Sequence, residues 1–310
     1  MNKNNIILDC DPGHDDAVAI ILAGHASNIN LLGITTTCGN QTIEKTTRNA
    51  LNMVDFLGLD TKVYKGSSRA ILKESPVCSA IHGESGLDGY TFPSLTIKEE
   101  KEDAVSFIIN TIKSSKEKVT MVTTGPMTNL ALAIVLDPTI LSNIDKIVLM
   151  GGSIGMGNVT PSSEFNIVTD PEAAYISFNA HVPIYMIGLD VTRKVLALKE
   201  RVDEIKAIGN KTSDLFVKLM ETYNANQKRV FNLDAGPMHD PLTIAYLIDN
   251  SVLKFEHVNT EIDLNHGSSY GRTNVDLSGY LNKEKNSFVA VDVDIDKFWT
   301  ILNQSIKSYK

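Results

Sequence analysis

The chain has 310 residues, of which 43% are hydrophobic and 21% charged, and its formal net charge is −8. This apolar content is enough to bury a large core, and a net negative charge without a basic patch argues against nucleic acid as a partner. The first apolar segment begins at Ile6, and no apolar run approaches the ~20 residues of a membrane span. We therefore expect a cytoplasmic protein with no membrane partner.

In the first part of the chain, short apolar runs alternate with helix-like patterns. Strands are expected at 6–8, 31–36, 63–64, 119–123, 147–150 and 184–189, and helices at 16–24, 42–57, 104–114, 129–135 and 171–178. The later part is more helical, with helices at 201–208, 213–224, 241–248 and 297–308 and one added strand at 287–293, whose end carries Asp292, Asp294 and Asp296 as polar positions on a sheet edge.

This order of elements predicts an α/β fold: an open, mostly parallel (mixed) sheet, Rossmann-like in its core, with helices on both faces and a helical C-terminal part. Linkers rich in Gly, Ser or Pro and internal repeats are not found. We therefore expect residues 1–310 to form one domain. The three cysteines, Cys10, Cys38 and Cys78, lack CxxC spacing, so neither a disulfide framework nor a zinc site is expected.

The segment at 9–16 places four carboxylates in the space of one sharp turn between an expected strand and an expected helix. They are Asp9, Asp11, Asp15 and Asp16. Pro12 and Gly13 turn the chain, so Asp11 at the strand end and Asp16 at the helix start can face one crevice. Such oxygens suit Ca²⁺ or Mg²⁺ better than zinc. The alternative, in which the helix-start residues only cap the helix, leaves the charges without a counter-ion.

Three later segments, 38–40, 124–126 and 151–153, are expected at the same edge, where parallel sheets bind ligands. A further carboxylate, Asp240, precedes Pro241 in a typical helix start, so helix capping is one interpretation of this residue. The adjacent His239 favours another, because a histidine beside an aspartate suits a catalytic acid next to a metal ligand.

Seven segments together point to a known family. They are DCDPGHDDA (9–17), GNQT (39–42), HGESGLDG (82–89), TGP (124–126), MGG (150–152), SEFN (163–166) and HD (239–240). In this order they resemble the nucleoside hydrolases, which split the N-ribosidic bond of nucleosides. Through these segments and YGRT (270–273), the chain is most similar to the bacterial ribonucleoside hydrolases that prefer pyrimidines.

The resemblance implies a Ca²⁺ ion, a nucleoside substrate and a homo-oligomer, either a tetramer or a dimer. The implied metal ligands are Asp11, Asp16, the backbone carbonyl of Thr124, and Asp240, with Asp11 also acting as general base on the attacking water. The implied ribose contacts come from Asp15, Asn40, Asn158, Glu164 and Asn166, and Met150 is a further expected substrate contact. A role in pyrimidine salvage would follow.

Elementary chemistry agrees with these roles. Ca²⁺ takes ~6–8 oxygens, which leaves room for water and ribose hydroxyls beside the protein ligands. Cleavage builds positive charge on the sugar, which nearby carboxylates favour. The spacing of Glu164 and Asn166 suggests a short extended stretch that points both side chains one way, although Asn166 could also be a loop filler and Asn158 a turn residue.

The base-binding side is less defined by the sequence. The resemblance places His82 near the base, although it borders a Gly-rich loop in which a histidine is usually solvated. Phe165, Gln227 and Phe231 could stack on or hydrogen-bond to a base, but such residues also pack between helices. Phe231 stands where a tyrosine is expected in the pyrimidine-preferring enzymes, so one polar contact is in question. His239 is expected to protonate the departing base because its ordinary pKa suits donation near neutral pH.

Two other functions fit parts of the sequence. Residues 151–155 match G-x-S-x-G, and Ser153, Asp190 and His239 follow the chain order of a serine hydrolase, although glycines and Pro161 stand where the helix of a nucleophile elbow should begin. A non-catalytic Ca²⁺-dependent nucleoside-binding protein would use the same pocket. The pairing of Asp11 with His239 argues against it, since a binder needs neither base nor acid.

Overall fold

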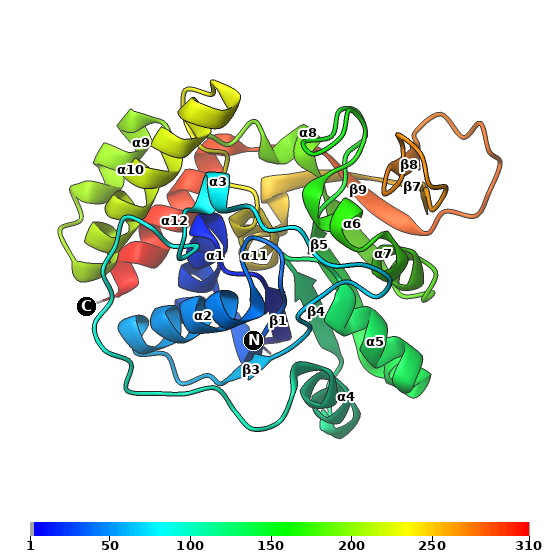
Figure 1. Cartoon of the computed structure of the whole chain (residues 1–310), viewed down its shortest axis with the longest axis horizontal. Coiled ribbons are helices and arrows are strands. Elements are labelled where there is room, and N and C mark those ends of the chain that lie inside the picture. Colours follow the sequence, from blue (N-terminus) through cyan, green and yellow to red (C-terminus); the bar gives the residue numbers. More distant parts are fainter. Residues whose placement is uncertain (1–2, 310) are drawn as a thin grey trace.

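The computed structural model describes residues 3–309, which build one nine-stranded sheet flanked by helices (Figure 1). The strands are β1 (Asn4–Cys10), β2 (Ile29–Thr36), β3 (Val63–Lys65), β4 (Val119–Thr123), β5 (Ile144–Met150), β6 (Ile184–Ile187), β7 (Leu253–Ile262), β8 (Thr273–Asp276) and β9 (Ser287–Val293). Their order in the sheet is β3-β2-β1-β4-β5-β6-β9-β7-β8.

The α-helices are α1 (His14–His25), α2 (Ile43–Leu57), α3 (Ser79–His82), α4 (Ala104–Ser114), α5 (Thr128–Leu136), α6 (Phe165–Thr169), α7 (Pro171–Phe178), α8 (Leu189–Thr192), α9 (Lys199–Lys206), α10 (Lys211–Phe231), α11 (Pro241–Ile248) and α12 (Ile295–Ser308). Two 3₁₀ helices are η1 (Pro138–Asn143) and η2 (Asn250–Val252). Within the described part of the chain, no helix combines the length and the hydropathy needed to cross a membrane.

Every strand pairing from β3 to β9 is parallel, and only β7 and β8 run antiparallel to their neighbours. The chain moves outward from β1 through β2 to β3, then returns to the other side of β1 and continues through β4, β5 and β6. The strand order therefore reverses between β1 and β4. In open α/β sheets, the crevice beyond the carboxyl ends of the strands at this point is where ligands bind.

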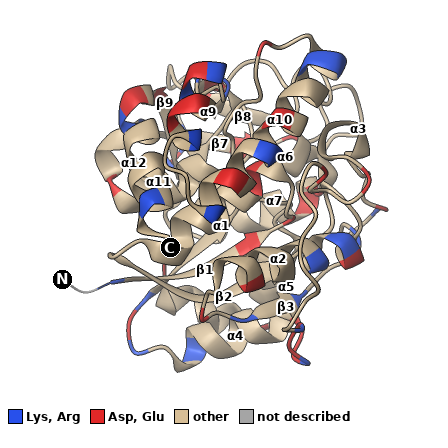
Figure 2. Cartoon of the chain, turned by 90° about the vertical axis from the view of Figure 1, so that its left-hand side faces the viewer, with Lys and Arg blue, Asp and Glu red and all other residues tan. Residues whose placement is uncertain are grey.

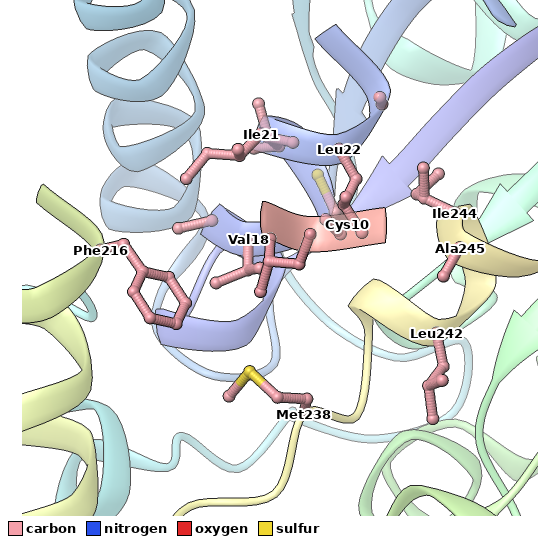
Figure 3. Close-up of a cluster of buried hydrophobic side chains, with 14 of the residues drawn as sticks. Cys10, Val18, Ile21, Leu22, Phe216, Met238, Leu242, Ile244 and Ala245 are labelled. Carbon is pink, nitrogen blue, oxygen red and sulfur yellow. The ribbon is translucent and has the colours of Figure 1, made fainter. Parts of the chain in front are cut away.

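Alternation along the strands divides the apolar core between the two faces of the sheet. In β1, Ile6, Leu8 and Cys10 join a cluster with α1, α10, α11 and α12, while Ile7 joins a cluster with α4, α5 and α7 on the opposite face. Figure 3 shows the first cluster, in which Val18 and Leu22 of α1 pack with residues of α10 and α11. Both faces are covered, so the strands are apolar on both sides, as parallel sheets require.

The predicted α/β fold is confirmed, but several details of the prediction were wrong. The strand expected at 184–189 ends at Ile187, and α8 follows. Strands β7 and β8 were not predicted, because β7 includes the polar run Lys254, Glu256 and His257 without regular alternation. The helix expected at 213–224 continues to Phe231.

The final strand has the predicted bounds, 287–293, but not the predicted edge position. β9 is not an edge strand, because it lies between β6 and β7. Asp294 caps α12 by accepting from the backbone nitrogen of Lys297 at 3.0 Å, and Asp296 lies in the first turn of that helix.

On the face shown in Figure 2, acidic and basic residues are interspersed over the helices and loops.

Candidate active site

The acidic turn lies at the carboxyl end of β1, beside the point where the strand order reverses. β1 ends at Cys10, and Gly13 is the N-cap of α1, so Asp11 stands in the turn while Asp15 and Asp16 occupy the first helical turn. All three carboxylates are buried, and Asp240 at the start of α11 is only 3% exposed. One carboxylate oxygen from each of Asp15, Asp16 and Asp240 lies within 4.8 Å of the others. Two carboxylates of the turn therefore meet one from the start of α11, and this group contains Asp15 where the resemblance implied Asp11.

Asn40, in the loop after β2, connects the two halves of the acidic turn. Its backbone nitrogen donates to Asp11 Oδ2 at 2.7 Å, and its side-chain amide donates to Asp16 Oδ2 at 3.0 Å. The loop must approach Asp11 closely to do so: a side chain at Gly39 would place its Cβ 2.1 Å from Asp11 Oδ2. Glycine at this position is required by the close approach.

Asp16 has further donors, whereas Asp11 keeps one oxygen free. Asp16 Oδ2 accepts from Gly13 N at 3.0 Å and Asp16 Oδ1 from Thr124 Oγ1 at 2.7 Å. Asp16 therefore does cap α1, as the simpler interpretation held, but it also faces the crevice. Asp11 Oδ1 is buried and has no hydrogen-bond partner among residues 3–309. A buried carboxylate oxygen without a donor is costly unless a cation faces it.

Burial and mutual repulsion perturb these carboxylates. Burial, with Asp16 as the next cause, raises the pKa of Asp11 well above its usual value, and burial with Asp16 raises the pKa of Asp15 to about 7. The pKa of Asp240 is raised well above its usual value by burial and then by Asp15 and Asp16. Each pKa is raised because several negative charges close together in a crevice shielded from water are unfavourable.

Asp240 does not serve as an ordinary helix cap. It precedes Pro241 at the start of α11, yet its side chain accepts no capping hydrogen bond there. Thr243 instead donates to the backbone carbonyl of Asp240 at 2.6 Å. The carboxylate is thus free to face Asp15 and Asp16, which argues against the capping interpretation of this residue.

Asn166 lies at the junction of the acidic crevice and the loops after β4 and β5. Its side-chain nitrogen donates to the carbonyl oxygen of Thr124 at 2.7 Å and to that of Met150 at 3.1 Å. Asn166 is 6% exposed. The amide therefore fixes the carbonyl that the family resemblance assigns to the metal.

Glu164 reaches the same region, although not from an extended stretch as predicted. It caps α6, and its carboxylate accepts from Gly152 N at 3.0 Å, Asn166 N at 3.0 Å and Ile167 N at 3.2 Å. Burial raises its pKa to about 6, while the backbone donors act in the opposite direction. The helical turn, rather than strand alternation, is what brings Glu164 and Asn166 together.

Asn158 is positioned by the loop between β5 and α6. Its Oδ1 accepts from Phe165 N at 2.9 Å, and its own backbone nitrogen donates to Ser163 O at 3.1 Å. The side-chain amide nitrogen is left for another partner. Asn158 is therefore more than a turn residue, because it ties the loop to the start of α6.

Comparison with known proteins agrees with this geometry. Residues 6–300 match the family model described as inosine-uridine preferring nucleoside hydrolase. The chain belongs to the nucleoside hydrolase family.

Two relatives illustrate the match. The pyrimidine-specific ribonucleoside hydrolase RihB of Escherichia coli is 42% identical over 309 residues, which cover 100% of this chain and 99% of that enzyme. Among solved structures, a purine-preferring ribonucleoside hydrolase from Gardnerella vaginalis is 36% identical, with a TM-score of 0.91 over 98% of this chain and 100% of the other. A plant nucleoside hydrolase is 29% identical with a TM-score of 0.91, covering 98% of this chain and 99% of that one. This nucleoside hydrolase is thus an N-glycosyl hydrolase.

The residues of the acidic crevice fit a divalent cation. The donor set consists of carboxylate and carbonyl oxygens, as hard cations prefer. Asp11 Oδ1 in addition has no partner in the described chain. The crevice of this nucleoside hydrolase could therefore hold a metal ion.

Around His82, which the resemblance places near the base, the hydrolase has a buried stack of three rings rather than an exposed loop histidine. His82 is 6% exposed, and its ring centroid lies 5.5 Å from that of His14 and 5.7 Å from that of Tyr223. His14 Nε2 lies 2.8 Å from the carbonyl oxygen of Asp88 in the Gly-rich loop. The alternative of a solvated histidine is contradicted, because His82 ends α3 and is buried.

His239 is held by α8. Its Nδ1 lies 2.7 Å from Thr192 Oγ1. Burial, and then the positive charge of Arg193, lowers the pKa of His239 to about 3. The ordinary histidine pKa assumed from the sequence is therefore wrong for this site: His239 is neutral at neutral pH, and it can offer only its single ring proton.

The other residues predicted for the base differ in their surroundings. Gln227 of α10 is 4% exposed and its Oε1 has no hydrogen-bond partner in the described structure. Phe165 is partly buried at the start of α6. Phe231, at the end of α10, is 50% exposed. Gln227 therefore has an acceptor to offer, whereas the side chain of Phe231 has no polar atom.

The structure excludes the serine hydrolase arrangement. Ser153 Oγ is buried and has no partner among the described residues, and β5 leads into a loop rather than a helix. Asp190 accepts from Ile154 N at 2.6 Å and from Gly155 N at 3.1 Å, and does not orient His239. A nucleophile elbow requires an exposed serine at a sharp turn from a strand into a helix, with the acid and the histidine of the triad as its partners.

Sequence reasoning missed three residues that shape the site. His14 stacks on His82, Thr192 holds His239, and Arg193 donates to the carbonyls of Met156 and Gly157 at 3.1 and 2.7 Å. His14 stands within the acidic motif, so its position was a signal. The other two lie in a helical turn that shows no chemical pattern in the sequence.

Proposed function

We propose that this nucleoside hydrolase is a Ca²⁺-dependent enzyme that cleaves the N-ribosidic bond of ribonucleosides, with a preference for uridine and cytidine, to release ribose and the free base. The observation that carries the proposal is the buried crevice of Asp11, Asp15, Asp16 and Asp240, in which Asp11 Oδ1 lacks a partner among residues 3–309. The match to the hydrolase family favours turnover over a binding protein without turnover.

The proposed ligands for Ca²⁺ are Asp11, Asp16, the carbonyl oxygen of Thr124, and Asp240. When bound, the ion would lower the pKa of water and orient the ribose hydroxyls. Asp11 is the proposed general base. Its Oδ1 is buried and has no hydrogen-bond partner among residues 3–309, so this oxygen is available to take a proton from water.

The proposed sugar contacts surround the ribose with polar groups that suit a neutral polyol. Amides such as Asn158 can both donate to and accept from hydroxyls. Carboxylates favour the positive charge that develops on the sugar as the bond to the base breaks. These contacts are Asp15, Asn40, Asn158, Glu164 and Asn166, and Met150 is proposed as a further substrate contact.

His239 is proposed to assist the departing base as a neutral donor. If Thr192 Oγ1 donates to His239 Nδ1, the ring proton resides on Nε2 and can be offered to the base. Gln227 and His82 are proposed to contact the base, Phe165 and Phe231 to line its apolar side. Phe231 cannot supply the hydroxyl expected there.

The preference for pyrimidines is supported by RihB, a pyrimidine-specific enzyme 42% identical to this chain. The purine-preferring Gardnerella vaginalis enzyme is similar to a lesser degree, at 36% identity. We also propose that the enzyme is a cytoplasmic homo-oligomer, a tetramer or a dimer, that acts in pyrimidine salvage, and that residues 1–310 form a single domain.

Release of reducing sugar tests the proposal directly. Purified protein with Ca²⁺ is incubated with uridine, cytidine or inosine, and free ribose and base are measured. We expect stoichiometric release, with kcat/KM for uridine above that for inosine. Tight binding of uridine without ribose release would support a nucleoside sensor instead, and faster turnover of inosine would contradict the pyrimidine preference.

A further inference from the structure

Residues 270–273 connect the β7–β8 hairpin to the loop that follows β5. They were notable in the sequence as YGRT, but none of the roles above uses them. Figure 1 shows the hairpin beyond α6, at the end of the sheet away from α2. Two of these residues hold opposite ends of the loop 151–163, which leads into Glu164 and carries Asn158.

Thr273 holds the beginning of that loop with one hydroxyl. Its Oγ1 accepts from Ser153 N at 2.9 Å and donates to Ser153 O at 2.7 Å, so both backbone groups of Ser153 are satisfied by a side chain that is 1% exposed. The neighbouring Gly152 has φ +74, a conformation that favours glycine. Its N–H donates to Glu164 Oε2 at 3.0 Å. Thr273 thus fixes the backbone that binds Glu164.

Tyr270 holds the end of the same loop through its backbone. Its carbonyl oxygen accepts from Ser163 Oγ at 2.9 Å. The carbonyl oxygen of Ser163 in turn accepts from Asn158 N at 3.1 Å. A single short segment therefore sets the position of both ends of the loop, and through them of Glu164 and Asn158.

We propose that residues 270–273 are a clamp that positions the sugar-binding loop, and that Thr273 is a positioning residue for ribose recognition. This inference rests on the proposed function, in which Glu164 and Asn158 contact the ribose. The clamp acts on groups that bind the sugar both before and during cleavage, so its loss should raise KM more than it lowers kcat.

The test compares Thr273→Val, which removes the hydroxyl, with Thr273→Ser, which keeps it. We expect Thr273→Val to lower kcat/KM for uridine by about 10- to 100-fold, mainly through KM, and Thr273→Ser to stay within about threefold of wild type. Thr260→Val is the matched control: Thr260 is a buried threonine of the same hairpin whose hydroxyl bonds to Ser287 Oγ at 2.7 Å, away from the loop. It should lose thermal stability without losing activity.

A double-mutant cycle separates positioning from general damage. In a Glu164→Gln background, adding Thr273→Val should cost less than about threefold in kcat/KM, because the group that Thr273 positions is already impaired. Full additivity would overturn the inference. So would equal losses in Thr273→Val and Thr260→Val that follow their melting temperatures.

Hydrogen exchange provides a readout that does not depend on turnover. Peptides within 151–163 should exchange about 10-fold faster in Thr273→Val than in wild type or Thr260→Val, because the Ser153 N–H loses its acceptor. Unchanged exchange would refute the clamp even if the wild-type protein released no ribose. An inactive wild type with faster loop exchange in Thr273→Val would refute the proposed function and retain the clamp.

Discussion

The side-chain amide of Asn166 donates to the backbone carbonyl oxygen of Thr124 at 2.7 Å, and so joins a proposed ribose contact to a proposed Ca²⁺ ligand. Outer hydrogen bonds of this kind orient metal ligands. This one side chain therefore couples the ribose contacts to the metal ligands, and a substitution of Asn166 should alter both ribose binding and Ca²⁺ binding.

Asn166→Ala should weaken Ca²⁺ binding by about 10-fold and also raise KM for uridine, because the carbonyl of Thr124 loses its orienting donor. Asn158→Ala is the matched control, since Asn158 Oδ1 bonds to Phe165 N rather than to a proposed metal ligand. It should raise KM alone. Calcium titration by calorimetry measures both. Wild-type Ca²⁺ affinity in Asn166→Ala would disconnect this residue from the metal.

Removal of Ca²⁺ by a chelator should abolish ribose release and lower the melting temperature by about 5 °C, because a ligand that binds only the folded state stabilises it. Without a cation, Asp15, Asp16 and Asp240 repel one another across less than 4.8 Å. Calorimetry with and without chelator gives the shift, and added Ca²⁺ should restore both properties. In Asp240→Asn the chelator should have little effect. If the chelator changes neither ribose release nor the melting temperature of the wild-type enzyme, the crevice does not hold a metal ion.

Turnover of 2′-deoxyuridine should be at least about 100-fold slower in kcat/KM than that of uridine, because buried groups arranged for a hydroxyl are left unpaired when it is missing. Competition between the two nucleosides in one assay measures the ratio directly. Equal turnover would contradict recognition of the ribose hydroxyls by the metal and the surrounding polar residues.

His239→Ala should reduce kcat/KM for uridine by about two to four orders of magnitude while largely preserving cleavage of p-nitrophenyl riboside, whose leaving group needs no donor. Thr192→Val should show the same pattern more weakly, since Thr192 only holds His239 Nδ1. Parallel assays on both substrates decide the matter. Equal losses on the two substrates would mean that His239 supports Asp240, and would move the search for a donor to His82.

Replacing Arg193 should change the protonation of His239 in a predictable direction. Burial, and then Arg193, holds the pKa of His239 at about 3. Loss of the cation in Arg193→Met should raise that pKa, whereas Arg193→Lys should keep it low. Titration of the His239 ring by NMR in the Ca²⁺-loaded enzyme measures it. The same pKa in both variants would show that burial alone controls it.

The same pKa has a consequence for stability. His239 in the unfolded chain takes up a proton near its usual pKa of 6.5, whereas in the folded protein it does so only near 3. Its contribution to the free energy of unfolding is therefore complete above pH 6.5 and is lost as the pH falls toward 3. Arg193→Met should lessen this loss. Urea unfolding at neutral and at acidic pH measures it, as the decrease in the free energy of unfolding between the two pH values in each protein.

The sequence alone determined the α/β class and the acidic crevice. Strand-helix alternation predicts a parallel sheet, and the turn at Pro12 and Gly13 places carboxylates at the carboxyl end of its first strand. Asp11 and Asp16 were predictable for this reason, because their relative position is set by a local turn. Asp9 does not take part as predicted, because its Oδ1 accepts from Thr35 Oγ1 at 2.7 Å and from Asn129 Nδ2 at 2.8 Å. The order of the motifs likewise indicated the family without any coordinates.

Only the tertiary structure decided what surrounds those carboxylates. The pKa of His239 depends on its burial and on Arg193, 46 positions earlier in the chain, so no local pattern could reveal it. The burial of His82 depends on packing against Tyr223, and the link from Thr273 to Ser153 spans 120 residues. Local residue patterns describe turns and periodicity, whereas desolvation and long-range hydrogen bonds arise only when distant segments pack together.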